Sequence, residues 1–319
     1  MKRELPDELK FLTNRKLPQK PFTESMSGKI CVITGATSGV GLEIARALAS
    51  HGAQLVLVNR NQVKADRVAW ELQSQWPVAV DSIVADFSDL EQVRQAADII
   101  LTRYPRIDVL VNCAGMHSTT RIFTSAGHET VFCVNHLASF LLTALLLDRM
   151  IASSPSRIIQ VNSEGHRFNG LDLDDLSWHK RHYTGLRSYG ASKTAQLLTV
   201  WEFADLLQGT GVTINAVHPG DVKTNIGHNN GWLYRFFTRY VTGLFLKDAA
   251  ISGPAIGYLA SAPELADVSG RFFHLTHEEK PAPHALDREM GKRVWAASLQ
   301  LTGLPADFGR VLREGWPPG

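Results

Sequence analysis

The feature that most constrains the fold is a regular alternation between short apolar runs and longer amphipathic stretches. Six runs rich in Val, Ile and Leu have the length and composition of buried strands, and five segments between them have helical periodicity. The expected strands span 29–34, 53–61, 82–87, 108–115, 156–163 and 212–220, and the expected helices span 41–52, 64–75, 91–104, 131–150 and 188–208. Apolar strands that alternate with amphipathic helices predict a parallel sheet covered on both faces.

The alternation continues through most of the chain without a repeat or a linker that would divide it. We therefore predict a single α/β domain, with a doubly wound parallel sheet of the Rossmann type, over about 28–304. Residues 1–27 form a polar N-terminal extension whose prolines discourage a long helix, and 305–319 form a C-terminal tail. Hydrophobic residues make up 44% of the chain, which is enough for a large core and excludes a disordered protein.

Charge, cysteine count and hydropathy each exclude a class of protein. A net charge of +2, with no run of five like charges, gives no support for nucleic-acid binding. The N-terminus lacks the apolar core of a signal peptide, and no apolar run approaches the roughly 20 residues of a transmembrane helix. The three cysteines cannot all pair, which argues against a disulfide framework and for a cytoplasmic protein. The twelve histidines form no His-x-x-x-His pair, so we expect no metal site.

The first strand runs into a glycine-rich turn, TGATSGVG (34–41), that opens the first helix. Glycine permits a tight turn and close backbone approach to a phosphate, and the N-terminus of the helix attracts negative charge. A glycine-rich turn without a ligand is the alternative, but the strand–turn–helix context favours a dinucleotide. No lysine follows the last glycine, which excludes a P-loop. The predicted cofactor contacts here are Gly35, Thr37, Ser38, Gly39, Val40 and Gly41.

The end of the second strand selects the ribose of a bound dinucleotide. An acidic residue there would hold the free 2′-hydroxyl of NAD, but this chain has Asn59 and Arg60. A guanidinium suits a 2′-phosphate, so the pair favours NADP(H) over NAD(H); the alternative is a solvated surface arginine. Asp86 ends the third expected strand, where it can accept a hydrogen bond from the adenine amine or cap the helix that starts near Leu90.

The expected helix 188–208 places Tyr189 and Lys193 four residues apart on one face. A free tyrosine has a pKa of about 10, and a neighbouring ammonium favours the phenolate that a general base requires. Most tyrosine–lysine pairs with this spacing are surface neighbours, so the pair by itself is weak evidence. Tyr183 and Arg187 have the same spacing in a loop-like stretch, and we rank them lower.

The combination of motifs is much more specific, and it resembles the short-chain dehydrogenase/reductase family over about 29–304. The motifs are the glycine turn 34–41, Asn112-Cys113-Ala114-Gly115, Asn135 within VNHLASF, Ser163 at a strand end, Tyr189-Gly190-Ala191-Ser192-Lys193 and His218-Pro219-Gly220. The resemblance implies that Tyr189 is the general acid/base and that Lys193 lowers its pKa and holds the nicotinamide ribose. It also implies that Ser163 orients the substrate oxygen and that Asn135 anchors a water in the proton relay.

The resemblance also extends the set of predicted cofactor contacts. These are Asp86 and Phe87 near the adenine, Asn112, Ala114 and Gly115 beside the adenosine ribose, Tyr189 and Lys193, and Pro219, Gly220, Val222 and Thr224 in the loop over the nicotinamide.

Several fragments are similar to the retinol dehydrogenase-like branch of this family, with its WW-domain oxidoreductase and protochlorophyllide reductase relatives. They are VNHLASFLLTALLL, the long insertion between Ser163 and Tyr189, and PELADVSGRFFH with KRVWAASLQLTGL near the C-terminus. The branch implies an NADP(H)-dependent oxidoreductase that interconverts an apolar alcohol and its aldehyde or ketone. The alternatives are a non-catalytic nucleotide-binding regulator or scaffold and a reductase of carbon–carbon double bonds. Homo-oligomers are common in the family.

Two features leave alternatives open. Residues 225–247 are rich in aromatic side chains; they form either a mobile lid over a lipophilic substrate or a helix that buries its aromatics on the core. Within them, 232–247 can lie on a membrane surface but should not cross one.

Glu164 directly follows the serine, and we expect it to face solvent rather than the pocket. Cys113 and Cys133 are expected to be small buried apolar residues rather than nucleophiles.

Overall fold

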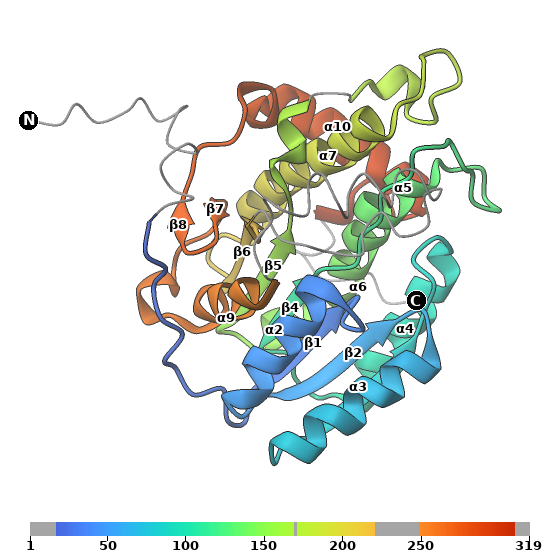
Figure 1. Ribbon diagram of the computed structural model, residues 1–319. Coiled ribbons are helices and arrows are strands. Elements are labelled where there is room, and N and C mark those ends of the chain that lie inside the picture. The colour runs from blue at the N-terminus through green and yellow to red at the C-terminus, as the bar shows by residue number, and fades with distance from the viewer. Residues whose placement is uncertain (1–16, 169–170, 221–248, 310–319) are drawn as a thin grey trace, which may run out of the picture.

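The computed structural model describes residues 17–168, 171–220 and 249–309. One eight-stranded sheet forms its centre, in the order β3-β2-β1-β4-β5-β6-β7-β8, and the strands from β1 to β7 are parallel (Figure 1). The predicted doubly wound α/β fold is confirmed. The strands are β1 (Ile30–Thr34), β2 (Gln54–Asn59), β3 (Val80–Val84), β4 (Val109–Asn112), β5 (Ser156–Val161), β6 (Val212–His218), β7 (Phe272–His274) and the antiparallel β8 (His277–Glu278).

Helices cover both faces of the sheet because successive strand residues point to opposite faces and both sets are apolar. Val32 and Val56 belong to one core layer, while their neighbours Ile33 and Leu57 belong to the other. The first layer lies under α4 (Leu90–Arg103), α6 (Ala138–Ala152), α7 (Gly185–Leu206) and α10 (Arg288–Thr302). The second lies under α2 (Gly39–Ser50), α3 (Gln62–Gln75) and α9 (Ser252–Ser261).

Two expected elements differ from the structure. The third strand ends at Val84 rather than at residue 87, so Asp86 lies beyond the strand in the turn toward α4. The helix expected over 131–150 is interrupted near its start. It consists of α5 (Thr130–Phe132), the π-helical turn η2 (Cys133–Leu137) and α6, and the π turn contains Asn135. Single π turns inside helices are frequent at functional sites.

This long helix also bears on membrane insertion. Thr130–Ala152 is the one helix within the described residues that is long and apolar enough to span a membrane, with a mean hydropathy of 1.9. In the fold 89% of that apolar window is buried, as in the core helix of a globular domain.

The described part of the predicted N-terminal extension, residues 17–27, packs against the fold. The Phe22 ring stacks on His51 with ring centroids 3.7 Å apart, and Lys20 Nζ donates to the Tyr258 hydroxyl at 2.8 Å. This segment therefore contacts α9 and the end of α2. The expected lid 225–247, with Val222 and Thr224, lies outside the described residues.

Candidate active site

The glycine turn at the end of β1 is shaped by two close backbone approaches. A Cβ on Gly35, whose φ is +72°, would lie 2.8 Å from Ala114 Cα, and a Cβ on Gly41 would lie 2.3 Å from the Gly35 carbonyl oxygen. Thr34 Oγ1 accepts hydrogen bonds from the backbone N–H groups of Cys113 and Ala114, both at 2.9 Å. The turn after β4 is therefore held directly against the turn after β1.

The N-terminus of α2 opens from this turn at the switch point of the sheet, between β1 and β4. Ser38 is the N-cap residue, and its side chain makes no capping hydrogen bond. Ser38 is exposed and Thr37 and Gly39 are partly buried, whereas Val40 is buried in the core. The backbone N–H groups and the positive end of the helix dipole are thus presented at the sheet edge where α/β folds bind phosphates.

The end of β2 contributes one buried and one exposed side chain. Asn59 is 3% exposed, and its Oδ1 accepts a hydrogen bond from the Ala36 N–H at 2.7 Å, so it braces the glycine turn. The Arg60 side chain is 68% exposed, and its Nη1 lies 4.0 Å from Asp86 Oδ2. The Arg60 guanidinium is therefore exposed next to Asp86, just after the end of β2.

Asp86 makes a turn of its own rather than capping α4. Its Oδ1 accepts hydrogen bonds from Ser88 N at 2.9 Å and Ser88 Oγ at 2.8 Å. The N-cap of α4 is Asp89, which accepts from Glu91 N at 3.0 Å. Of the two roles left open for Asp86, capping of α4 is excluded, and the turn places Asp86 beside Arg60. Phe87 is buried in the core.

The last residue of β4 and the turn that follows it contact different parts of the protein. The buried Asn112 side chain donates to Thr143 Oγ1 at 2.9 Å and so points toward α6. A Cβ on Gly115 would lie 3.4 Å from Asn135 Oδ1. Ala114 therefore packs against the glycine turn, and Gly115 packs against Asn135 in the π turn.

Tyr189 and Lys193 lie one turn apart on α7. Lys193 Nζ is 5.9 Å from the centroid of the Tyr189 ring, and it donates to the Val161 carbonyl at 2.8 Å and to Gln196 Oε1 at 3.3 Å. The Lys193 side chain is buried, and desolvation lowers its pKa to about 8. The ammonium is thus anchored at the end of β5, beside the phenol.

Ser163 lies close to Tyr189 because Gly165 contacts both residues. The sequence analysis missed Gly165. The Gly165 N–H donates to Ser163 Oγ at 3.0 Å, which leaves the serine proton to be donated elsewhere. A Cβ on Gly165 would lie 2.6 Å from Tyr189 Cε1 and 3.4 Å from Ser163 Oγ. Only glycine therefore allows the tyrosine ring and the serine hydroxyl to approach one another here.

Asn135 connects three parts of the site. Its Oδ1 accepts from Met116 N at 2.7 Å, and its Nδ2 donates to Met116 O and to Ser192 Oγ, both at 3.0 Å. Its carbonyl oxygen accepts from Gln196 Nε2 at 3.2 Å, so Gln196 links Asn135 to Lys193. The four predicted catalytic residues are brought together, and Gln196 and Ser192 are two positioning residues that the sequence analysis missed.

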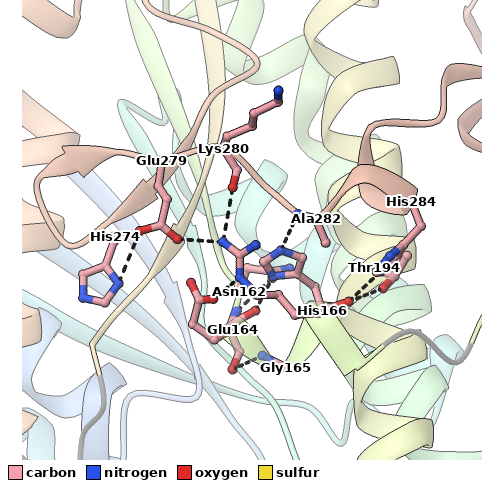
Figure 2. Close-up of polar contacts among 12 residues, drawn as sticks. Asn162, Glu164, Gly165, His166, Thr194, His274, Glu279, Lys280, Ala282 and His284 are labelled. Carbon is pink, nitrogen blue, oxygen red and sulfur yellow. Dashed lines mark hydrogen bonds and ion pairs between the residues drawn. The ribbon is translucent and has the colours of Figure 1, made fainter. Parts of the chain in front are cut away.

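The segment after Ser163 is held by the C-terminal part of the chain (Figure 2). His166 Nδ1 pairs with the Ser163 carbonyl at 2.7 Å, and His166 Nε2 accepts from Ala282 N at 3.1 Å. Desolvation lowers the pKa of His166 to about 4, so its ring is neutral. His284 and Thr194 bond the His166 carbonyl, at 2.8 and 3.1 Å.

Glu164 does not face solvent as expected. It turns inward and forms an ion pair with Arg167, whose Nη2 also donates to Glu279 Oε1 at 2.8 Å. Burial acts to raise the pKa of Glu164, but His218 and Arg167 outweigh it and hold the pKa below its ordinary value. The carboxylate is therefore ionised although three quarters of the side chain is covered, its exposed fraction being 25%.

Tyr183 precedes Arg187 by four residues, the same spacing as between Tyr189 and Lys193, but it has a structural role. It precedes α7, and its hydroxyl donates to the Ser118 carbonyl at 3.1 Å and to Glu129 Oε1 at 3.3 Å. Burial raises the pKa of Tyr183 to about 12, which makes it a poor base. Desolvation also raises the pKa of Cys113 and Cys133 to about 12, so both thiols stay protonated as expected of residues that are not nucleophiles.

The lowered pKa of Lys193 predicts a specific dependence of stability on pH. Between pH 8 and the unfolded value of 10.5, the folded chain binds fewer protons at this residue than the unfolded chain does. Stability therefore rises with pH in this window, and the penalty for burying the ammonium is fully present below it. Between pH 8 and 10.5 we expect the free energy of unfolding of the wild type to rise by about 2–3 kcal/mol more than that of the Lys193→Met variant. Urea unfolding at several pH values measures the difference, and parallel curves for the two proteins would contradict it.

Comparison with known proteins agrees with this geometry. Residues 29–231 match the family model for short chain dehydrogenases. The chain belongs to the short-chain dehydrogenase family. The match confirms the family that the motifs indicated. Members of this family are oxidoreductases that use nicotinamide dinucleotides, and the chain is therefore an enzyme of the dehydrogenase type.

Individual members resemble this short-chain dehydrogenase over almost its whole length. Retinol dehydrogenase 13 from Homo sapiens is 38% identical over 291 residues, which cover 90% of this chain and 88% of that protein. The crystal structure of an uncharacterized protein from Mycobacterium paratuberculosis superposes with a TM-score of 0.73 at 28% identity, over 90% of this chain and 98% of the other. A structure from Beutenbergia cavernae, assigned as an NAD(P)-dependent gluconate 5-dehydrogenase with bound NADP, has a TM-score of 0.65 at 26% identity, over 81% and 98%. The retinol dehydrogenase-like branch is thereby confirmed as well.

Proposed function

We propose that this short-chain dehydrogenase is an NADP(H)-dependent enzyme that interconverts an apolar alcohol and its aldehyde or ketone. The observation that carries the proposal is the packing of Ser163, Gly165 and Tyr189 against one another, with the Lys193 ammonium one helical turn away. In the proposed reaction the serine hydroxyl and the phenol act together on one substrate oxygen, which suits proton transfer at an alcohol or a carbonyl.

The residues around the glycine turn fit a nicotinamide dinucleotide. The approaches at Gly35 and Gly41 leave the N-terminus of α2 open to a pyrophosphate, and Ala114 and Gly115 lie where the adenosine ribose would pass. Pro219 and Gly220 follow β6 at the same sheet edge and suit the nicotinamide end. The bound cofactor supplies or accepts the hydride.

The chain's own residues would handle the proton and the orientation of the substrate. Ser163 Oγ accepts from the Gly165 N–H and so donates its own proton to the substrate oxygen. Tyr189 gives a proton to that oxygen during carbonyl reduction and removes it during alcohol oxidation. The Lys193 ammonium favours the phenolate, since it lies near the ring in a buried setting. Gln196 accepts from Lys193 and donates to the Asn135 carbonyl, so it holds Lys193 in place, and Asn135 would anchor a water of the proton relay.

The preference for NADP(H) rests on Arg60. Its exposed guanidinium follows the end of β2, where the chain itself has Asn59 and Arg60 rather than an acidic residue, and Asp86 Oδ2 lies 4.0 Å from Arg60 Nη1. The Beutenbergia cavernae structure with bound NADP is consistent with this choice.

Arg60→Leu is expected to weaken NADPH binding about 10- to 100-fold and to leave NADH binding nearly unchanged, because one charge-assisted contact to the 2′-phosphate is lost. Fluorescence titration of both nucleotides measures the effect. Arg67→Leu, which removes an exposed cation from α3, is the matched control and should change neither affinity. Equal losses for both nucleotides would refute this role of Arg60.

The substrate class is supported by the relatives named for retinol, an apolar alcohol. The test is a titration of NADPH against NADH, followed by turnover with a panel of medium-to-long apolar aldehydes and ketones. NADPH binding with carbonyl reduction supports the proposal. Tight binding without turnover of any panel member would point to a nucleotide-binding scaffold. Product mass together with a retained carbonyl absorbance would instead identify reduction of a carbon–carbon double bond.

A further inference from the structure

The carboxyl ends of β5, β6 and β7 bring together three metal-ligating side chains that the proposed reaction does not use. They are Glu164, His218 and His274, and their candidate ligand atoms all lie within 4.8 Å of one another. His218 and His274 are 5% and 4% exposed. We propose that these three residues form a binding site for one divalent cation of the zinc type.

The register of the sheet explains why the side chains converge. His218 and His274 are direct partners in the adjacent parallel strands β6 and β7, so both point to the same face of the sheet. Their ring centroids are 4.9 Å apart, and the rings are inclined by 72°. Glu164 follows β5, which pairs with β6 on the other side. Three successive strand ends thus contribute one ligand each.

The carboxylate of Glu164 is divided between two environments. Its Oε2 accepts from Arg167, whereas its Oε1 is buried and has no hydrogen-bond partner among the described residues. A buried carboxylate oxygen requires a donor or a cation. Oε1 is therefore the oxygen available to a metal ion, and Arg167 holds the other oxygen in place.

The charges around the site also favour a cation. Two carboxylates, Glu164 and Glu279, share the single guanidinium of Arg167, so that carboxylates outnumber guanidinium groups around the site. Glu279 Oε2 lies 3.8 Å from His274 Nδ1, and this contact is drawn in Figure 2. Carboxylates that approach metal-ligating histidines in this way fix the orientation of the ring and raise its basicity.

The neighbouring histidines are not part of the ligand set. Both ring nitrogens of His166 are engaged by backbone groups, and His284 Nε2 pairs with the His166 carbonyl (Figure 2). The set is therefore two imidazoles and one carboxylate, which suits Zn²⁺ better than the oxygen-preferring Mg²⁺ or Ca²⁺.

A cation held here would tie together two segments of the active site. Glu164 directly follows Ser163, and His218 directly precedes Pro219 and Gly220. The ion would fix the serine segment relative to the loop after β6. The sequence analysis expected no metal site because the three ligands are far apart in the chain and follow no recognisable spacing.

The proposal is tested without nucleotide or substrate, so its outcome is independent of the proposed reaction. Chelator-treated full-length protein is dialysed against zinc, and bound metal is measured by mass spectrometry. We expect about one zinc ion per chain and a higher thermal unfolding temperature with zinc but not with magnesium. Glu164→Gln and His274→Gln are each expected to lower zinc affinity, measured by chelator competition, by at least about tenfold.

His277→Gln is the matched control, because His277 lies on β8 close to His274 but its Nε2 pairs with the Pro18 carbonyl. It should retain the wild-type zinc affinity. No zinc retained above background, or equal zinc affinity in the wild type and both ligand variants, would overturn the proposal. A melting temperature that does not respond to zinc would also overturn it.

Discussion

Tyr189→Phe is expected to lower kcat by about 10²- to 10⁴-fold, which is the usual contribution of a positioned general acid or base. The variant removes only the phenolic oxygen, and the ring can keep its contacts with Gly165 and with His117, whose ring centroid is 5.8 Å away. Nucleotide affinity should therefore stay nearly unchanged. Steady-state turnover of the best carbonyl substrate and a titration with NADPH measure the two effects.

Tyr183→Phe is the control for this prediction. The variant removes the same phenolic oxygen from a tyrosine that also lies four residues before a cation. The Tyr183 hydroxyl, however, bonds the Ser118 carbonyl and the Glu129 carboxylate. It should retain turnover. If Tyr189→Phe retained wild-type turnover, or if Tyr183→Phe lost as much, the assignment of the acid/base would be wrong.

Gly165→Ala is expected to lower kcat/KM by about 100-fold, a loss typical of a displacement of about 1 Å at a reacting group. The new methyl group would lie 2.6 and 2.8 Å from two carbons of the Tyr189 ring, so the ring has to move away from residue 165 and out of its present position. NADPH titration and thermal unfolding show whether the fold survives, and turnover then isolates the effect on geometry.

Gly309→Ala is the control, because a Cβ at that position would make an ordinary 3.4 Å contact with Leu206. It should change neither turnover nor nucleotide binding. A Gly165→Ala enzyme with wild-type kcat/KM would show that Tyr189 and Ser163 do not need their close approach.

Much of the fold was predictable because central strands such as β1, β2 and β4 are apolar on both faces. Val32 and Ile33 are neighbours that pack into opposite core layers, and such a run can only be a strand inside a covered sheet. The short strand β7 and the two-residue β8 were not predicted, since three and two residues give no readable period. The π turn around Asn135 was also missed, because it inserts into a helix whose apolar pattern continues on both sides.

The candidate site was predictable where motifs are local in the chain. Tyr189 and Lys193 are four residues apart on one helix, and the glycine turn directly joins β1 to α2. Gly165 and Gln196 were missed because their roles depend on contacts with Tyr189 and Lys193 in the folded protein. Glu164 was expected in solvent, but Arg167 turns its carboxylate into the protein.

The sequence by itself determined the α/β class, the nucleotide turn, the family and the four predicted catalytic residues, because periodicity and short motifs are properties of neighbouring residues. The tertiary structure alone decided which distant groups meet. It placed Glu164 beside His218 and His274, and it set Gly165 against Tyr189. The first of these groupings depends on strand order and register, which bring residues as far apart in the chain as Glu164 and His274 to one edge of the sheet.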